Sequence, residues 1–302
     1  MAKESFTLED VARWTAQGDL PPLIQWAVPI MLALVAVEYV LGLREKKQLY
    51  GGKDLLSSIG VGVGYLLVTA VTRSGTFLAV LWVYNAVPWS IPLTWWSGVL
   101  CFIWLDFWRY WSHRWAHEQR FLWGTHVTHH SSPHYNFAVS FRLSWVDQIK
   151  LVFFLTIPLL GFHPIVFFIS HQVAVLYQFW IHTELIRKLP APIEYIFVTP
   201  SHHRVHHATN PQYIDKNYGS TFIIWDRMFG TFEPEGEQPV YGITEPPNTY
   251  NPIHLSFHVF YDIWRDVRRA RSLREAWLLV FGRPGIEKQI FSSVDSSSSS
   301  RT

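Results

Sequence analysis

Three clusters of histidines are the residues of this chain best suited to chemistry. One is a pair in the pattern H-x-x-x-H, and two follow the pattern H-x-x-H-H, with a further single histidine between those two. Residues three and four positions apart lie on the same face of a helix, so we expect each cluster to present its imidazoles along one stripe. The candidate ligands are His113, His117, His126, His129, His130, His182, His203, His206 and His207.

The number of these histidines indicates which metal chemistry to expect. Imidazole nitrogen binds iron, zinc, copper and nickel, but a zinc site uses only three or four protein ligands. Nine candidate ligands are too many for one ion and suit two ions with open coordination positions. The only cysteine, Cys101, argues against an iron–sulfur cluster and forms no intrachain disulfide. Other histidines have no partner at ligand spacing and are expected to be structural: His134, His163, His171, His254 and His258.

Apolar segments must position these clusters, and their lengths indicate a membrane. Charged residues make up only 16% of the chain, which also has 16 Trp and 13 Tyr residues, types that favour membrane interfaces. Residues 23–41 are long enough to cross a bilayer core of about 30 Å. A second apolar region, 55–87, is interrupted at Arg73, Ser74 and Gly75 and forms either one long helix or a hairpin. We favour a single crossing, because the histidines must meet on one side.

Two further apolar segments lead directly to histidines. Residues 91–111 run into the first pair, and residues 151–180 precede His182. The second of these segments is interrupted at 161–164, which predicts a helical hairpin turn or two half-spans. Gly124 is expected to separate the first two clusters, and Pro200 is expected to begin the helix of the third.

Basic residues give an expected orientation and complete the predicted fold. Arg44, Lys46 and Lys47 directly follow the first span, which places that end in the cytoplasm by the positive-inside rule. The sequence therefore predicts an all-α integral membrane protein, a transmembrane helical bundle with a cytoplasmic helical cap carrying a histidine-rich di-metal site. We expect one membrane-embedded domain over 23–285, after an N-terminal segment (1–22) and before a disordered Ser-rich tail (286–302). A basic helix around 264–279 is expected to lie on the anionic membrane surface.

With these motifs the chain resembles the fatty acid hydroxylase and sterol desaturase superfamily. The resemblance covers about 106–242 and rests on H-x₃-H, H-x₂-H-H, a separate single histidine and a final H-x₂-H-H. Within the superfamily the chain resembles the alkylglycerol monooxygenase branch. That closer resemblance is carried by the segments QFWIHTE, TPSHHRVHHATN and DKNYGSTFIIWDRMFGTFEPE.

The resemblance implies an O₂-dependent, non-haem di-iron oxidoreductase in which the candidate histidines hold two iron ions. It implies hydroxylation of a C–H bond of a lipid, whether alkylglycerol, fatty acyl or sterol-like, with electrons from an external reductant. In the alkylglycerol branch that reductant is tetrahydrobiopterin, and a redox protein docking at the cytoplasmic face is the alternative. The implied location is the bacterial inner membrane or the endoplasmic reticulum.

One position departs from the superfamily pattern and leaves part of the site open. Many members have a further H-x₃-H pair in the third region, where this chain has Gln178 and His182. An oxygen donor from Glu184 or Asn217 could fill the missing position. His202 lies one residue outside the H-x-x-H-H register, so its role is open as well.

Each of three charged residues near the clusters has two possible roles. Asp106 precedes His113 by about two helical turns and is either an acceptor for an imidazole N–H or a buried partner of Arg109. Arg142 and Arg204 either contact a head group or reductant, or form ion pairs at the bilayer interface.

Rival functions use the same residues differently. The same di-iron centre could desaturate or demethylate a lipid or sterol. A histidine-rich metal transporter would place its ligands at the bilayer midplane on broken helices, whereas these clusters lie at span ends beside Arg114 and Arg120. A zinc hydrolase would require H-E-x-x-H, which is absent, and a net charge of +2 does not indicate a nucleic-acid partner.

Overall fold

Helices form all the regular secondary structure in the part of the chain that the computed structural model describes, residues 5–18 and 21–299 (side chains to 292). Within those residues the only β-type pairings are two isolated bridges, Phe197 with Phe222 and Ala208 with Tyr241. The helices are α1 (Leu8–Gln17), α2 (Leu23–Arg44), α3 (Gly52–Ala86), α4 (Trp95–Glu118), α5 (Arg120–Gly124), α6 (Val127–His130), η1 (Phe137–Phe141), η2 (Asp147–Lys150), α7 (Leu151–Phe154), α8 (Thr156–Leu159), α9 (Pro164–Trp180), α10 (Ala191–Ile196), α11 (Pro200–His206), α12 (Ile224–Phe229), α13 (Pro252–Val267), α14 (Leu273–Phe281) and α15 (Ile286–Ser299).

Two helices of the described residues, α2 and α3, are long and apolar enough to cross a membrane. Helix α3 is one unbroken helix of 35 residues, which confirms the single-helix alternative for this region. The Arg73 guanidinium lies over the Phe77 ring, 5.5 Å from its centroid, and this contact one turn away accommodates the charge within the helix. At 1.5 Å per residue α3 is about 52 Å long, so it extends beyond a hydrocarbon core of about 30 Å.

Helices α4 and α9 pack along each other and lead to the histidines. Their contact includes part of the apolar core, with Cys101, Leu105 and Ala174 fully buried. Helix α4 has 24 residues, and α9 is apolar but has only 17. Neither meets the length and hydropathy of a span, so their crossing of the membrane remains a prediction.

The predicted hairpin turn at 161–164 is present between α8 and α9. Gly161 has φ 88°, and a Cβ there would lie 2.9 Å from Trp89, so the turn requires glycine. The His163 side chain accepts from the Ile165 amide at 3.3 Å, and Pro164 occupies the first position of α9. Both features favour the start of a helix.

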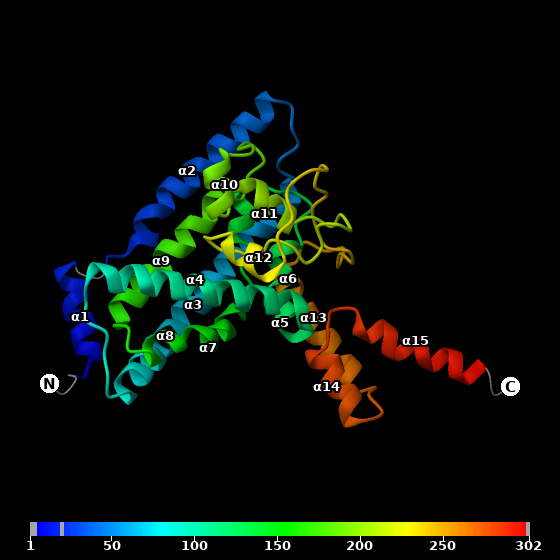
Figure 1. Ribbon diagram of the computed structural model, residues 1–302. Helices are drawn as coiled ribbons and strands as arrows, with labels where there is room; N and C mark the ends of the chain where they lie inside the picture. The colour runs from blue at the N-terminus through cyan, green and yellow to red at the C-terminus, as the bar shows by residue number, and fades with distance from the viewer. Residues whose placement is uncertain (1–4, 19–20, 300–302) are drawn as a thin grey trace.

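Short helices surround the histidines. Figure 1 shows α5, α6, α11 and α12 beside the C-terminal half of α4, with α13 and α14 leading away from them. Helix α4 ends at the extended residue Gln119, and α5 ends at Gly124. The chain therefore breaks twice between the first two clusters, once more than the sequence predicts.

The terminal segments are described in part. Residues 1–4, 19–20 and 300–302 lie outside the described residues, so the expected boundaries at 1–22 and 286–302 are only partly visible. Phe6 is 7% exposed and exchanges backbone hydrogen bonds with the Asn85 side chain at 3.0 and 2.8 Å, so the N-terminal segment packs on α3. The segment expected to be a disordered tail contains α15.

Candidate metal centre

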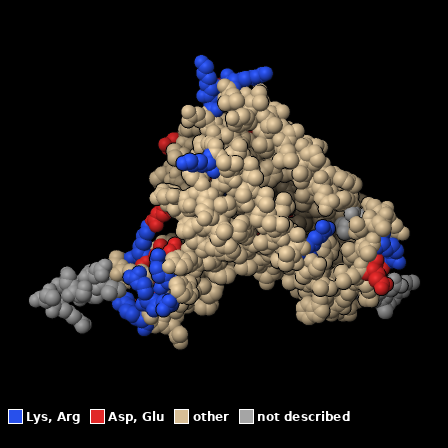
Figure 2. Space-filling view, turned by 180° about the vertical axis from the view of Figure 1, so that it is seen from behind, with Lys and Arg blue, Asp and Glu red and all other residues tan. Residues whose placement is uncertain are grey.

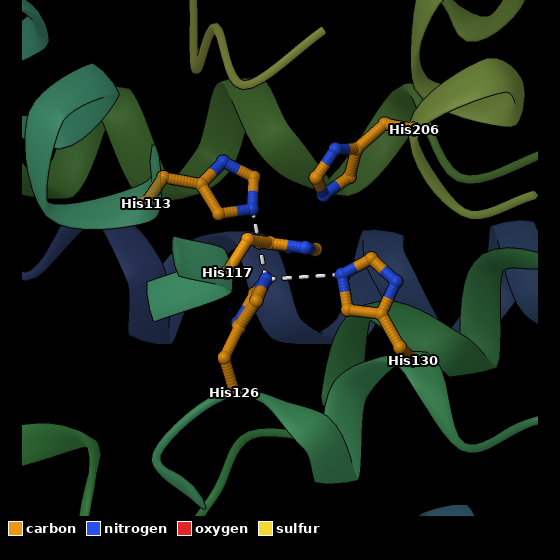
Figure 3. A group of neighbouring side chains, drawn as sticks. All are labelled: His113, His117, His126, His130 and His206. Carbon is orange, nitrogen blue, oxygen red and sulfur yellow. Dashed lines mark hydrogen bonds between the residues drawn. The ribbon is translucent and has the colours of Figure 1, made fainter. Parts of the chain in front are cut away.

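The candidate histidines converge into two adjacent groups in which the ligand nitrogens lie within 4.8 Å of one another. The His130 and His207 rings stack between the groups, with centroids 4.3 Å apart. Figure 3 shows the first group, with its imidazoles pointing toward one another from α4, the 126–130 segment and α11. Site A consists of His113, His117, His126, His130 and His206, and site B consists of His129, His182, His203 and His207.

Each H-x-x-H-H motif divides its histidines between the two sites. His126 and His130 belong to site A, whereas His129, between them in sequence, belongs to site B. The third cluster does the reverse, since His203 and His207 are in site B and His206 is in site A. At 100° per residue, positions i+3 and i+4 point about 100° apart around a helix. The two H-x-x-H-H clusters therefore each face both sites, because α6 and α11 lie between the sites, whereas His113 and His117 both belong to site A, as expected for one stripe.

The spacing of the imidazole nitrogens suits metal coordination. In site A the Nε2 atom of His126 lies 2.8 Å from that of His113 and 3.0 Å from that of His130. In site B the Nε2 atom of His182 lies 3.1 and 2.9 Å from those of His129 and His203. Neighbouring ligands of an octahedral ion with bonds of about 2.1 Å are about 3.0 Å apart. The donors are therefore spaced as ligands of one ion in each site.

Backbone carbonyls fix the tautomer of three of these histidines. The Nδ1 atom of His113 lies 2.8 Å from the Tyr218 oxygen, that of His206 lies 3.0 Å from the Lys216 oxygen, and that of His182 lies 2.7 Å from the Gln178 oxygen. A carbonyl oxygen only accepts, so each Nδ1 carries the proton and each Nε2 presents a lone pair. This is the usual outer contact of a metal-bound histidine.

Unpartnered nitrogens provide a second test of fit. The Nε2 atoms of His117 and His206 are buried and have no hydrogen-bond partner. A buried polar atom without a partner costs about 1–3 kcal/mol, so an ion at site A would satisfy them. The residues of site A therefore fit a bound metal ion.

Burial keeps the imidazoles neutral. It lowers the pKa of His113, His129 and His203 well below the usual 6.5, and neighbouring histidines lower it further. Burial likewise lowers the pKa of His182 to about 3 and that of His206 to about 4. Neutral imidazole is the form that binds metal.

One loop supplies several outer contacts of site A. Residues 215–218 provide the carbonyls of Lys216 and Tyr218, and an Asp215 carboxylate oxygen lies 3.9 Å from Nδ1 of His117. Asp215 and Asn217 have φ of 62° and 55°, left-handed values that Asn and Asp tolerate better than most residues.

The loop is held by buried side chains. Asn217 donates to the carbonyls of His202 at 3.1 Å and Glu233 at 2.8 Å. The two Asp226 oxygens accept from the amides of Tyr218 and Gly219, each at 2.7 Å. The Asn217 side-chain oxygen also accepts from the Glu233 amide at 2.9 Å, so this side chain is committed to supporting the backbone.

The other open candidates have partners elsewhere or join neither site. The Gln178 side-chain oxygen accepts from Arg109. His202 lies 3.0 Å from a Glu194 carboxylate oxygen, and Glu184 joins neither group. Asp106 accepts from the amides of Thr221 at 2.8 Å and Phe222 at 3.1 Å, and from the Trp225 indole at 2.9 Å. Its hydrogen bonds thus hold the chain beyond the 215–218 loop.

Two buried arginines form ion pairs and hydrogen bonds that connect to the ligand-bearing segments. Arg142 pairs with Asp54 at 3.0 Å and donates to the Thr128 carbonyl at 3.2 Å, beside His129. Arg204 pairs with Glu235 at 2.6 Å and donates to the Thr183 carbonyl at 3.1 Å. The ion-paired alternative is thus confirmed for both, although they lie inside the protein, 1% and 6% exposed.

The matches to known proteins cover the part of the chain that carries both sites. The fatty acid hydroxylase family model matches residues 98–231, which contain every histidine of both sites. The chain is 40% identical over 274 residues to the alkylglycerol monooxygenase of Homo sapiens and 38% identical over 272 residues to that of Xenopus tropicalis. Each alignment covers 88% of this chain and 60% of the relative.

A more distant relative modifies another lipid. The ornithine lipid hydroxylase OlsE of Rhizobium tropici is 28% identical over 198 residues, covering 64% of this chain and 58% of that protein. No solved structure matches the chain. Residues 98–231 thus match the fatty acid hydroxylase family, and the chain is similar over most of its length to alkylglycerol monooxygenases.

Proposed function

We propose that this protein is a membrane di-iron monooxygenase that hydroxylates a C–H bond of a lipid, using O₂ and an external reductant. The observation that carries the proposal is the pair of adjacent buried sites, with five imidazoles in one and four in the other. The relatives named as alkylglycerol monooxygenases and as an ornithine lipid hydroxylase support a lipid as the substrate.

The histidines of site A would hold one iron ion and those of site B the other. When bound, such a pair of ions supplies the activation of O₂ needed to oxidise an unactivated C–H bond, which no side-chain acid or base can do. The chain itself keeps the imidazoles neutral and orients them. Burial keeps them neutral, and hydrogen bonds from the Nδ1 protons of His113, His182 and His206 to backbone carbonyls orient them.

A contact between α2 and the segment that follows α9 supports a cytoplasmic location for the sites. Thr183, next to His182, donates to Glu38 on α2, and Glu38 lies six residues before Arg44. Site B is therefore near the end of α2 that carries the exposed Arg44, Lys46 and Lys47. The positive-inside rule assigns that end to the cytoplasm, where tetrahydrobiopterin or a redox protein would have access to the sites.

Metal analysis tests the metal part of the proposal. The full chain is purified in detergent, enriched in ⁵⁷Fe, and analysed for metal content and by Mössbauer spectroscopy. About two irons per chain in a spin-coupled pair is the expected result. One zinc per chain, unaffected by His129→Ala and His206→Ala, would refute it.

Product mass tests the reaction. The iron-loaded protein is incubated with ¹⁸O₂, tetrahydrobiopterin and, in separate reactions, an alkylglycerol, an ornithine lipid and a fatty acyl lipid. Hydroxylation adds one ¹⁸O atom to the lipid or to the aldehyde released from a hydroxylated ether. Loss of two hydrogens without oxygen would instead identify a desaturase.

A further inference from the structure

Helices α13 and α14 expose apolar side chains along one face each. On α13, Ile253, Phe257, Tyr261 and Trp264 are 61%, 39%, 60% and 54% exposed, and their spacing of three or four residues places them on one stripe. On α14, Leu273, Trp277 and Phe281 are exposed in the same spacing, and Leu273 is 91% exposed. Exposed apolar stripes of this kind mark a site of contact with a partner or a membrane.

This apolar surface is continuous with a candidate span. Pro252, the first residue of α13, lies against Gly60 of α3, where an added Cβ would be 2.8 Å from it. Trp145 bridges the same two helices, since its indole donates to the Val61 carbonyl at 2.9 Å and its ring centroid lies 6.0 Å from that of Phe257. Exposed apolar residues flank Gly60 on α3, namely Leu56, Ile59 and Val63.

Arginines gather where α13 passes into α14. Arg268, Arg269, Arg271 and Arg274 are all exposed, and in Figure 2 Lys and Arg side chains cluster beside the grey C-terminal end. The Arg268 guanidinium lies over the Trp264 ring at 4.7 Å. Arg271 pairs with Glu275 at 3.1 Å.

We propose that α13 and α14 form a surface that lies in the membrane interface and binds anionic lipid head groups. Trp and Tyr beside Arg are the residues that anchor proteins at this depth, with rings in the head-group region and guanidinium groups on phosphates. The excess of arginine over acidic residues at 268–275 fits an anionic lipid better than a zwitterionic one. This surface is separate from the metal chemistry of the proposed function.

Fluorescence of a label at position 273 tests the proposal in the full chain. Leu273→Cys is labelled with an environment-sensitive fluorophore and reconstituted into nanodiscs of phosphatidylcholine alone or with phosphatidylglycerol. Gln238→Cys, an exposed position on the 230–240 loop, is the matched control, and the unsubstituted chain measures labelling of the buried Cys101. We expect a blue-shifted label at 273 that lipid-borne nitroxides quench and aqueous iodide does not, and a water-exposed label at 238.

Charge variants test the lipid preference. Each arginine near an anionic surface contributes a factor of about five to its binding, so replacing Arg268, Arg269 and Arg274 by Gln should weaken docking by about 100-fold in phosphatidylglycerol. The triple Lys variant keeps the charge and should retain docking. Equal iodide quenching at 273 and 238 in both lipids would overturn the membrane surface and favour a protein partner. Docking that is insensitive to phosphatidylglycerol and to the Gln variant would overturn the anionic lipid preference.

Discussion

Replacing Asp226 by Asn should weaken iron binding at site A and leave site B unchanged. The Asp226 carboxylate is fully buried and accepts three hydrogen bonds, from the amides of Tyr218 and Gly219 and from the Thr231 hydroxyl, each at 2.7 Å. It thereby positions the Tyr218 carbonyl that binds His113. In the proposed di-iron centre, iron binding at site A would therefore depend on a residue that does not touch the metal.

The magnitude follows from those hydrogen bonds. Asn keeps one oxygen, but its NH₂ group must face a backbone N–H, most simply that of Gly219. A buried donor without an acceptor costs about 1–3 kcal/mol of the free energy of unfolding. Loss of an outer contact to a metal-bound histidine typically lowers metal affinity about 10–100-fold, and we expect this for site A alone.

The assay titrates iron-loaded protein with a chelator and follows each iron by its Mössbauer signal. Burial raises the pKa of Asp226 to about 6, so titration at pH 7.5 compares an ionised carboxylate with the amide. Asp106→Asn is the matched control, because Asp106 also accepts two backbone amides, but those of Thr221 and Phe222, beyond the 215–218 loop. Equal loss of both irons in Asp226→Asn, or the same selective loss in Asp106→Asn, would refute the reasoning.

Three further predictions test the sites and their support. His129→Ala and His203→Ala should perturb the same iron signal, although these residues lie in different motifs, whereas His126→Ala should perturb the other signal. Perturbation of the same signal by His126→Ala and His129→Ala would contradict the division between the sites. Arg142→Ala should lower the free energy of unfolding by about 3–5 kcal/mol, because it leaves the Asp54 carboxylate buried without its partner. Denaturation in detergent measures this change. The double variant with Asp54→Ala should lower the free energy of unfolding by less than the sum of the two single changes. The metal-free chain should lose stability as the pH falls below 6.5. Burial holds the pKa of His182 at about 3 and that of His206 at about 4, and it keeps the pKa values of the other site histidines well below 6.5. Below pH 6.5 the unfolded chain then binds more protons than the folded one, and the loss is at most about 1.4 kcal/mol per pH unit for each histidine; unchanged denaturation curves between pH 7.5 and 5.5 would contradict neutral buried histidines.

Sequence patterns predicted the ligand-bearing elements but not how they share the metal sites. The spacing of His113 and His117 on one helix and the turn at 161–164 follow from local rules, and both are present. The assignment of His129 to one site and His130 to the other depends on how α6 is oriented by its neighbours. That orientation is a tertiary property, so a helical pattern alone does not contain it.

The outer contacts of the histidines were also beyond sequence reasoning. The acceptors at Lys216 and Tyr218 are backbone carbonyls, which carry no side-chain signature. Their positions depend on left-handed conformations at Asp215 and Asn217. An Asn or Asp tolerates that conformation but also occurs in many other turns, so the residue types alone do not locate the loop. The nearby Asp106, a candidate from sequence, instead supports the following residues.

Each of the two candidate spans, α2 and α3, contains a buried carboxylate that contacts a segment carrying candidate metal ligands. Glu38, fully buried on α2, accepts from the Phe137 amide at 2.7 Å and from Thr183 next to His182. Asp54, near the start of α3, accepts from Ser132 at 2.7 Å and pairs with Arg142. Arg142 in turn donates to the Thr128 carbonyl, next to His129. A buried carboxylate is costly unless it is paired or hydrogen-bonded, and both carboxylates here are satisfied by groups adjacent to metal ligands. Glu38 and Asp54 thus connect the apolar helices α2 and α3 to the segments that carry the candidate ligands. Displacement of α2 or α3 would therefore strain the segments carrying His182 and His129.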